Sequence, residues 1–147
     1  PNFDAQELQK WNAEQGNQTD DIPHFRVSEL KLIQAEARAM DANAVTQGAV
    51  DALNDVRTNR GLAGVTVADY ATSGVDGFID DVLEERQREF IGEGHRFYDL
   101  KRLQRDIPKP PVTTFAPELP FSSFRILDDI PPAQIDINPE LTQNPGY

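Results

Sequence analysis

The chain has 147 residues, a net charge of −11 and no cysteine. A chain of this length suits one domain that buries roughly two-thirds of its unfolded surface, so a hydrophobic core is possible. The acidic surface repels phosphate groups, which argues against nucleic acid and anionic membranes as direct partners. The lack of cysteine excludes disulfides and thiolate chemistry.

The first 25 residues are polar and show little periodicity. We interpret residues 1–25 as a loop and short-helix remnant of an upstream region, because the chain begins Pro-Asn-Phe without an initiator methionine. The sequence contains no apolar run of the length that a signal peptide or a membrane span needs. We therefore expect a fragment of a longer protein whose targeting signal lies upstream.

Apolar side chains recur at helical spacing along residues 26–42, on two adjoining flanks that together predict a wide face for burial between two neighbours. The first flank is Val27, Leu30, Ile33 and Ala37, and the second is Leu32, Ala35, Ala39 and Met40. Asn43 is a plausible stop for this helix.

Three more helices are predicted further along the chain. The four predicted helices cover residues 26–42, 46–60, 75–91 and 96–104. The short link between the first two predicts an antiparallel pair. Two such pairs, of about 35 residues each, match the length of a tetratricopeptide-like unit. We therefore predict a mainly α fold of tetratricopeptide-like antiparallel helix pairs.

The last third of the chain is rich in proline, which removes backbone donors and breaks helices. Three prolines stand at 108, 110 and 111, and six more fall between 117 and 145. This composition predicts a long, extended tail without helix. The tail keeps many apolar side chains, so we expect it to pack on the helices, with Ile130, Ile135 and Tyr147 as anchors.

Several charged residues stand on or beside the apolar faces of the predicted helices. A buried charge needs a partner, so these side chains predict an ion-pair network between helices. Its members are Glu36, Arg57, Arg86, Glu89, Glu93, Arg96 and Asp99. Such a network acts either as a structural strut or as a binding site for a polar ligand, and we favour the strut.

The sequence offers few candidates for chemistry. Trp11 and Tyr70 are the best candidates for stacking on a sugar ring, although aromatic residues more often belong to a core or its rim. Paired carboxylates such as Asp80 with Asp81 arise by composition in a chain with 25 acidic residues. No zinc-ligand spacing, twelve-residue calcium loop, catalytic motif or cofactor motif occurs, and a looser calcium site at Asp128, Asp129 or Asp136 is the one alternative left open for a metal. We expect no enzyme, no metal and no cofactor.

Four segments of the chain carry motifs that occur together, in the same order, in one known family. The first is residues 29–37 (Glu-Leu-Lys-Leu-Ile-Gln-Ala-Glu-Ala), and the second is residues 52–61 (Ala-Leu-Asn-Asp-Val-Arg-Thr-Asn-Arg-Gly), whose second Arg is displaced by one position. The third is residues 85–90 (Glu-Arg-Gln-Arg-Glu-Phe) with 93–102 (Glu-Gly-His-Arg-Phe-Tyr-Asp-Leu-Lys-Arg), and the fourth is the ending over 130–139 and 142–147. Together these segments resemble the SusD/RagB family of nutrient-binding lipoproteins, and they make residues 26–147 similar to that family's C-terminal helical region and tail.

The resemblance implies a function for the whole protein. Such proteins sit as lipoproteins on the outward face of the cell outer membrane, partner a TonB-dependent transporter of the SusC-like kind, and bind oligosaccharides or peptides without cleaving them. The ending resembles the family's C-terminus, and the lipid anchor and most ligand contacts belong to upstream sequence. Two alternatives stay open: a helical-repeat scaffold for protein docking without glycan binding, and a glycoside hydrolase fragment.

Overall fold

The computed structural model describes residues 25–108 and 118–147. The described residues fall into two compact units divided between Glu93 and Gly94, and each unit is described by itself. The elements of the first unit are α1 (Val27–Ala42), α2 (Gln47–Asn59), the 3-10 helix η1 (Val67–Tyr70) and α3 (Gly74–Glu89). Those of the second are α4 (His95–Arg102), β1 (Ile107–Pro108), β2 (Glu118–Leu119), the 3-10 helix η2 (Phe124–Ile126) and α5 (Pro132–Ile137).

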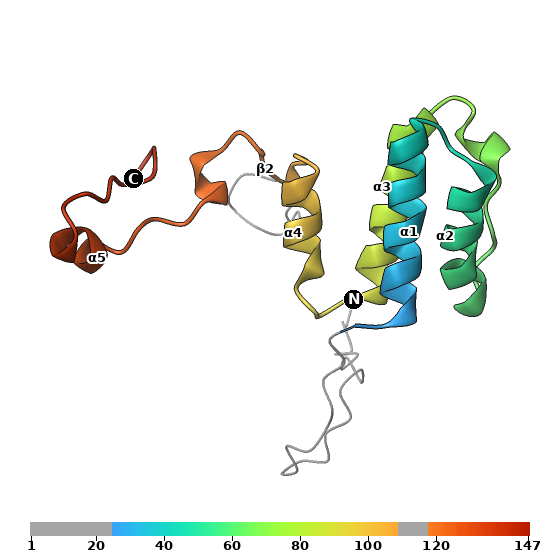
Figure 1. Ribbon diagram of the computed structural model, residues 1–147, viewed down its shortest axis with the longest axis horizontal. Coiled ribbons are helices and arrows are strands. Elements are labelled where there is room, and N and C mark those ends of the chain that lie inside the picture. The colour runs from blue at the N-terminus through green and yellow to red at the C-terminus, as the bar shows by residue number, and fades with distance from the viewer. Residues whose placement is uncertain (1–24, 109–117) are drawn as a thin grey trace, which may run out of the picture. The chain divides into compact units, whose positions relative to one another are not determined.

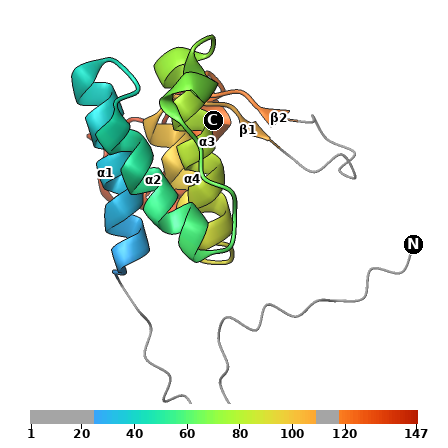
Figure 2. The ribbon, with the colours of Figure 1, turned by 90° about the vertical axis from the view of Figure 1, so that its right-hand side faces the viewer.

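The first unit is a three-helix assembly in which α1 packs against both α2 and α3. The chain runs up α1 and down both α2 and α3, so α1 is antiparallel to each of its neighbours (Figure 1, Figure 2). The mainly helical fold and the first antiparallel pair are therefore confirmed. The predicted pairing of α3 with α4 would be a contact between the two units, and it stays a prediction.

The turn between α1 and α2 follows from its local sequence. Asn43 closes α1 in the left-handed conformation, with φ of 46°, which asparagine tolerates better than most residues. Thr46 precedes α2 in an extended conformation, and its hydroxyl accepts a hydrogen bond from the Ala49 amide at 3.2 Å. This side chain satisfies one of the donors that a helix start leaves without an internal partner. The predicted helix ends are thus correct to within one residue here.

Small and branched apolar residues form the core of this unit. Ala35 and Ala39 of α1 and Ala49 and Ala52 of α2 are fully or almost fully buried, which lets the two backbones approach closely. Aromatic and aliphatic side chains of α3 fill the remaining space. The main core residues are Leu32, Ala35, Ala39, Ala49, Val50, Ala52, Leu53, Val56, Phe78, Ile79, Val82 and Leu83.

One predicted apolar flank of α1 is exposed rather than buried in the described structure. Val27 is 71% exposed, Leu30 60% and Ile33 48%, and Ala37 is exposed as well. Only the second flank, apart from Met40, faces α2 and α3. The prediction of burial between two neighbours was wrong for the first flank because both neighbours pack on the alanine-rich side. We call the exposed residues Val27, Leu30, Ile33, Ala37 and Met40 the α1 stripe.

The Asn54 side chain of α2 holds the segment that follows this helix. The Asn54 amide donates to the Val65 carbonyl oxygen at 2.8 Å, and its Oδ1 accepts from the Val65 amide at 2.8 Å. Gly64 lies so close that an added Cβ would stand 3.2 Å from Asn54 Oδ1. The Asn54 side chain therefore satisfies both backbone hydrogen-bonding groups of Val65.

Replacing Asn54 with alanine is expected to lower the free energy of unfolding by about 1–3 kcal/mol, because both Val65 backbone groups lose their partner. The urea midpoint of residues 1–147 measures the effect. Asn59→Ala is the matched control: it removes an exposed amide of the same helix and should change stability by no more than about 0.5 kcal/mol. Equal midpoints for the two variants would contradict the role assigned to Asn54.

The second unit contains one more α-helix than the sequence predicts, and also the 3-10 helix η2. α4 matches the predicted fourth helix and contacts β1, which pairs antiparallel with β2. The proline-rich tail was predicted to lack helix, yet Pro132–Ile137 forms the short helix α5. A proline in the first helical turn loses no hydrogen bond, because the first amides of a helix have no internal acceptor. Pro132 therefore starts this helix instead of preventing it.

The tail folds back on itself at its end. The Gln143 side chain accepts from the Ile130 amide at 2.8 Å and donates to the Ile130 carbonyl at 2.9 Å. The Tyr147 hydroxyl donates to the Leu127 carbonyl at 2.8 Å, and its ring meets Phe124 edge-on. Of the three expected anchors, Ile130 and Ile135 are half-buried and Tyr147 is 52% exposed. Packing of the tail on the helices stays a prediction.

Gly146→Ala is expected to disrupt the contacts that fold the tail back on itself. Gly146 has φ of +99°, and an added Cβ would stand 2.5 Å from Phe124 Cγ, so the backbone has to move. Hydrogen exchange at the Ile130 amide should accelerate about tenfold or more. Thr142→Ala, an exposed change nearby, should leave the rate unchanged. An unaltered Ile130 rate in the glycine variant would show that the closure does not depend on this contact.

Candidate functional site

A buried carboxylate at the end of α3 joins all three helices of the first unit. Glu89 is only 7% exposed. Arg60, the residue that closes α2, donates to it through Nε at 2.9 Å and Nη2 at 2.7 Å. The Ser28 hydroxyl of α1 donates to Glu89 Oε1 at 2.8 Å, and Arg26 Nη1 lies 4.0 Å from the same oxygen. We call Arg26, Ser28, Arg60 and Glu89 the Glu89 cluster.

The electrostatics of the Glu89 cluster follow from these contacts. The hydrogen bonds from Arg60 hold the pKa of Glu89 below its usual value, against the opposing effect of burial, and Ser28 and Arg26 add to this lowering. The same hydrogen bonds raise the pKa of Arg60. Both groups are therefore charged at neutral pH, and the pair forms a bidentate charge-assisted contact.

A second buried carboxylate lies one helical turn before Glu89. Glu85 is almost fully buried and faces two guanidinium groups, with Arg57 Nη1 at 3.4 Å and Arg88 Nη1 at 3.1 Å from its Oε2. Arg57 also donates through Nε to the Ala63 carbonyl at 3.1 Å. This arrangement ties α2 and the segment after it to α3.

The residues expected to form one network are placed as follows. Glu36 and Arg86 are buried, and the Arg86 guanidinium stands 5.2 Å from the centre of the Phe90 ring. Arg57, Glu89 and Glu93 make ion pairs with Glu85, Arg60 and Arg26, respectively. Arg96 and Asp99 belong to the second unit, where Asp99 accepts from Arg102. A single network through all seven stays a prediction.

The predicted network left out five charged residues that take part in these contacts: Arg26, Arg60, Glu85, Arg88 and Arg102. One signal was available, because Glu85, Glu89 and Glu93 recur every four residues and so share one face of a helix. Arg26 and Arg60 gave no periodic signal, since they stand just outside the ends of α1 and α2. Only the packing of the helices brings them to Glu89.

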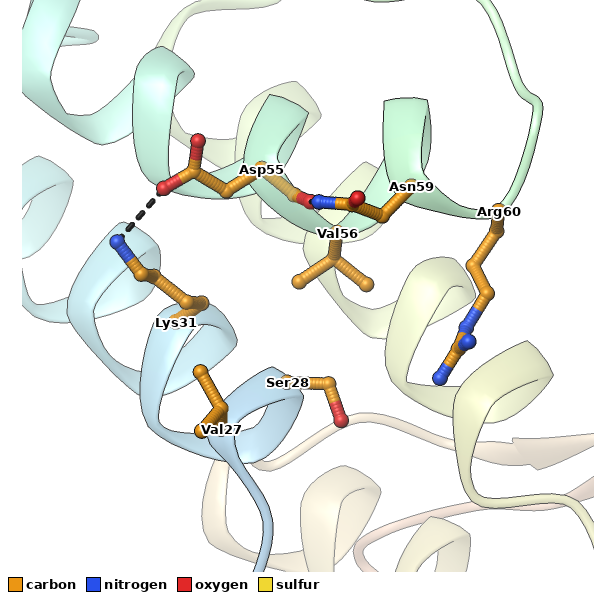
Figure 3. Close-up of a pocket in the computed structure, with 7 residues that line it drawn as sticks. All are labelled: Val27, Ser28, Lys31, Asp55, Val56, Asn59 and Arg60. Carbon is orange, nitrogen blue, oxygen red and sulfur yellow. Dashed lines mark hydrogen bonds and ion pairs between the residues drawn. The ribbon is translucent and has the colours of Figure 1, made fainter.

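A groove of about 420 Å³ opens between the start of α1 and the end of α2. Side chains of both helices point toward this space, with Lys31 and Asp55 at one end and Ser28 and Arg60 at the other (Figure 3). We call it the α1/α2 groove; it is lined by Val27, Ser28, Lys31, Asp55, Val56, Asn59 and Arg60.

Polar groups of both kinds surround an apolar floor in the α1/α2 groove. Val56 is buried and forms part of that floor. The Lys31 ammonium donates to Asp55 Oδ2 at 2.6 Å. Asn59 donates through its amide to the Asp55 carbonyl at 2.6 Å. The groove therefore presents a cation, a carboxylate and an amide within one small volume, and its far wall includes two members of the Glu89 cluster, Ser28 and Arg60.

The two aromatic candidates are not part of this groove. Tyr70 is 6% exposed, its ring meets Phe78 edge-on, and its hydroxyl donates to Asp81 at 2.7 Å. Burial and this hydrogen bond raise the pKa of the Tyr70 phenol. Tyr70 is thus a core residue, and its ring face is not open to a sugar. Trp11 lies outside the described residues.

Three further features concern metal ligands, membrane-spanning helices and the acidic residues of α3. Across residues 25–108 and 118–147, no three His, Asp or Glu side chains gather as the ligands of a metal ion would. No helix in the same part of the chain is both long and apolar enough to cross a membrane. Asp81, Glu84 and Glu85 each contact a tyrosine or an arginine, so these acidic residues take part in packing and ion pairs.

The fold and the site describe a helical protein region with internal ion pairs and a polar groove. Comparison with known proteins identifies its class. The sequence profile of the SusD family matches residues 3–147, and the chain belongs to this family. A SusD-like protein of Formosa agariphila is 28% identical over an alignment of 145 positions, and the match covers 92% of this chain and 27% of that protein. The chain therefore spans about a quarter of the length of this curated relative.

Solved structures agree with this assignment. A SusD superfamily protein from Bacteroides vulgatus is 35% identical, with a TM-score of 0.66 over 84% of this chain and 27% of its own. One from Bacteroides thetaiotaomicron is 28% identical, with a TM-score of 0.62 over 82% of this chain and 27% of its own. A third, from Parabacteroides distasonis, is 23% identical with a TM-score of 0.65, covers 84% of this chain and 27% of its own, and supports the fold alone.

Glu89→Gln is expected to lower stability at pH 7 and to flatten its dependence on pH. The lowered pKa of Glu89 contributes stability that is complete above its ordinary value of 4.5 and is lost as the pH falls through the lowered value. The variant should lose about 1–3 kcal/mol at neutral pH, and the difference from the parent should shrink in acid. Urea midpoints between about pH 3 and 7 measure this.

The matched control for this change is Glu84→Gln. Glu84 pairs with Arg88 at 2.7 Å on the surface, where both side chains are at least half exposed. Exposed pairs contribute little, so this variant should stay within about 1 kcal/mol of the parent. If the two variants follow the same pH profile, the Glu89 cluster has no special weight in the fold.

Proposed function

We propose that this chain is the C-terminal scaffold part of a non-catalytic nutrient-binding subunit. The whole protein would bind oligosaccharide as part of an outer-membrane, TonB-dependent uptake complex. The observation that carries this proposal is membership of the SusD family across residues 3–147. Because the chain spans 27% of its curated relative, the activity belongs to the whole protein and not to this region alone.

The contacts of the described residues support the scaffold role. Glu85 and Glu89, the most buried carboxylates of α3, are held by arginines of the same unit. Groups engaged in this way fix the relative register of helices and have little freedom to act as acids or bases on a substrate. This supports the proposal that the subunit binds its ligand without cleaving it.

The location and partners form part of the same proposal. The subunit would be an outward-facing lipoprotein of the outer membrane, with its lipid anchor outside this chain. Its partner would be a SusC-like transporter, and its ligand an oligosaccharide, with peptide as the other nutrient class. Nucleic acid is a poor ligand for a chain with a net charge of −11.

One observation favours a second function, that of a docking scaffold without glycan binding. The α1 stripe places aliphatic side chains such as Leu30 and Ile33 on the surface at helical spacing. Exposed apolar surface of this kind suits contact with another helix. Under this alternative the stripe would be essential for assembly, and the protein would bind no sugar.

Calorimetry on the complete protein separates these functions. A panel of neutral oligosaccharides and small peptides is titrated into it, and nutrient binding should give saturable heat with at least one oligosaccharide. The same samples should release no shortened sugar on prolonged incubation. Absence of binding across the panel would contradict the proposed function and favour docking alone, whereas release of shortened products would show that the protein is an enzyme.

A further inference from the structure

We propose that the α1/α2 groove is a binding subsite for one neutral sugar residue. The inference rests on the proposed function, because it names the place in this chain where a hydroxyl-rich ligand would contact it. The groove has about 420 Å³ of space, within the range of small-molecule sites in proteins. It lies wholly within the first unit, between two helices whose packing the core fixes.

The hydrogen-bonding groups of the groove determine what it suits. Among the described residues, no group engages Asp55 Oδ1 or Asn59 Oδ1, so two residues that line the groove each keep an acceptor. Lys31 uses one of its three donors for Asp55. Arg60 commits Nε and Nη2 to Glu89 and keeps Nη1. Residues that line the groove thus keep both donors and acceptors.

This mixture selects against charged ligands. A phosphate or carboxylate would meet the Asp55 carboxylate, and an ammonium group would meet Lys31 and Arg60. A hydroxyl group both donates and accepts, so a ring that carries several of them can satisfy both kinds of partner at once. The apolar floor at Val27 and Val56 suits the carbon–hydrogen face of the same ring.

The walls of the groove are held before any ligand arrives. Ser28 and Arg60, on opposite helices, both donate to the single carboxylate of Glu89. At the other end, the pair of Lys31 with Asp55 again joins α1 to α2. Contacts of this kind lower the cost of ordering side chains when a ligand binds. The groove is therefore a site with fixed walls between two helices.

Nuclear magnetic resonance on residues 1–147 tests the subsite. The probes are methyl β-glucopyranoside, methyl β-galactopyranoside and methyl α-mannopyranoside, with glycerol and tri-alanine for comparison. At least one glycoside should cause saturable amide shifts confined to residues 27–31 and 55–60. If no glycoside binds, if the shifts lie elsewhere, or if glycerol or tri-alanine gives the same response, the proposal is overturned.

Two variants at exposed positions locate the binding. Asn59→Ala removes one acceptor and should weaken binding of the responding glycoside about tenfold. Val27→Trp places a large ring in the groove and should abolish binding while leaving the core intact, since Val27 is 71% exposed. Gln47→Ala is the matched control: Gln47 lies on the same helix, is exposed and bonds Asp51 four residues on, much as Asn59 bonds Asp55 four residues back. Its affinity should equal that of the parent.

The same variants in the complete protein separate this inference from the proposed function. If the complete protein binds an oligosaccharide and Asn59→Ala weakens that binding, both stand. If it binds equally well with and without Asn59→Ala and Val27→Trp, the subsite is wrong and the nutrient-binding function stands. If the complete protein binds no oligosaccharide while residues 1–147 bind a glycoside at the groove, the subsite stands and the proposed function fails.

Discussion

The burial of one carboxylate, Glu89, is the constraint on which the first unit depends. A charge this far from solvent has to be met by opposite charge and by donors, and here the donors come from both other helices. Arg60 reaches Glu89 from the end of α2, and Ser28 reaches it from the first turn of α1. These contacts tie the end of α3 to the end of α2 and the start of α1. Since Ser28 and Arg60 also line the α1/α2 groove, the interaction that fixes the fold also fixes the shape of the proposed subsite.

The two sides of α1 serve different purposes. The side with Ala35 and Ala39 packs closely on α2 and α3, because small side chains let helix backbones approach. The other side, the α1 stripe, presents larger aliphatic groups to the surface. A family member of which this chain spans about a quarter has ample further sequence, and exposed apolar surface at helical spacing is what a scaffold offers to additional helices. The scaffold role and the docking alternative therefore draw on the same observation.

Local signals predicted the elements well and their partners less well. The helix limits near Asn43 and Thr46 were correct because capping depends on residues close in sequence. The short helix α5 was missed because proline was read only as a breaker, although at the first turn of a helix it costs no hydrogen bond. Tyr70 was considered for sugar stacking, yet it packs against Phe78, an assignment that needs the position of α3.

The sequence by itself determined the helical class, the ends of the main helices, the acidic surface and the resemblance to the SusD family. These properties follow from composition, short-range periodicity and motifs in a fixed order. Only the tertiary structure decided which flank of α1 is buried, since that depends on where α2 and α3 pack. It also decided that Arg26 and Arg60, which belong to no periodic pattern, meet Glu89 and Glu93. Arg60 and Glu89 are separated by 29 positions in the sequence, and Arg26 and Glu93 by 67. Contacts over such separations arise from the packing of whole helices and cannot be predicted from local sequence.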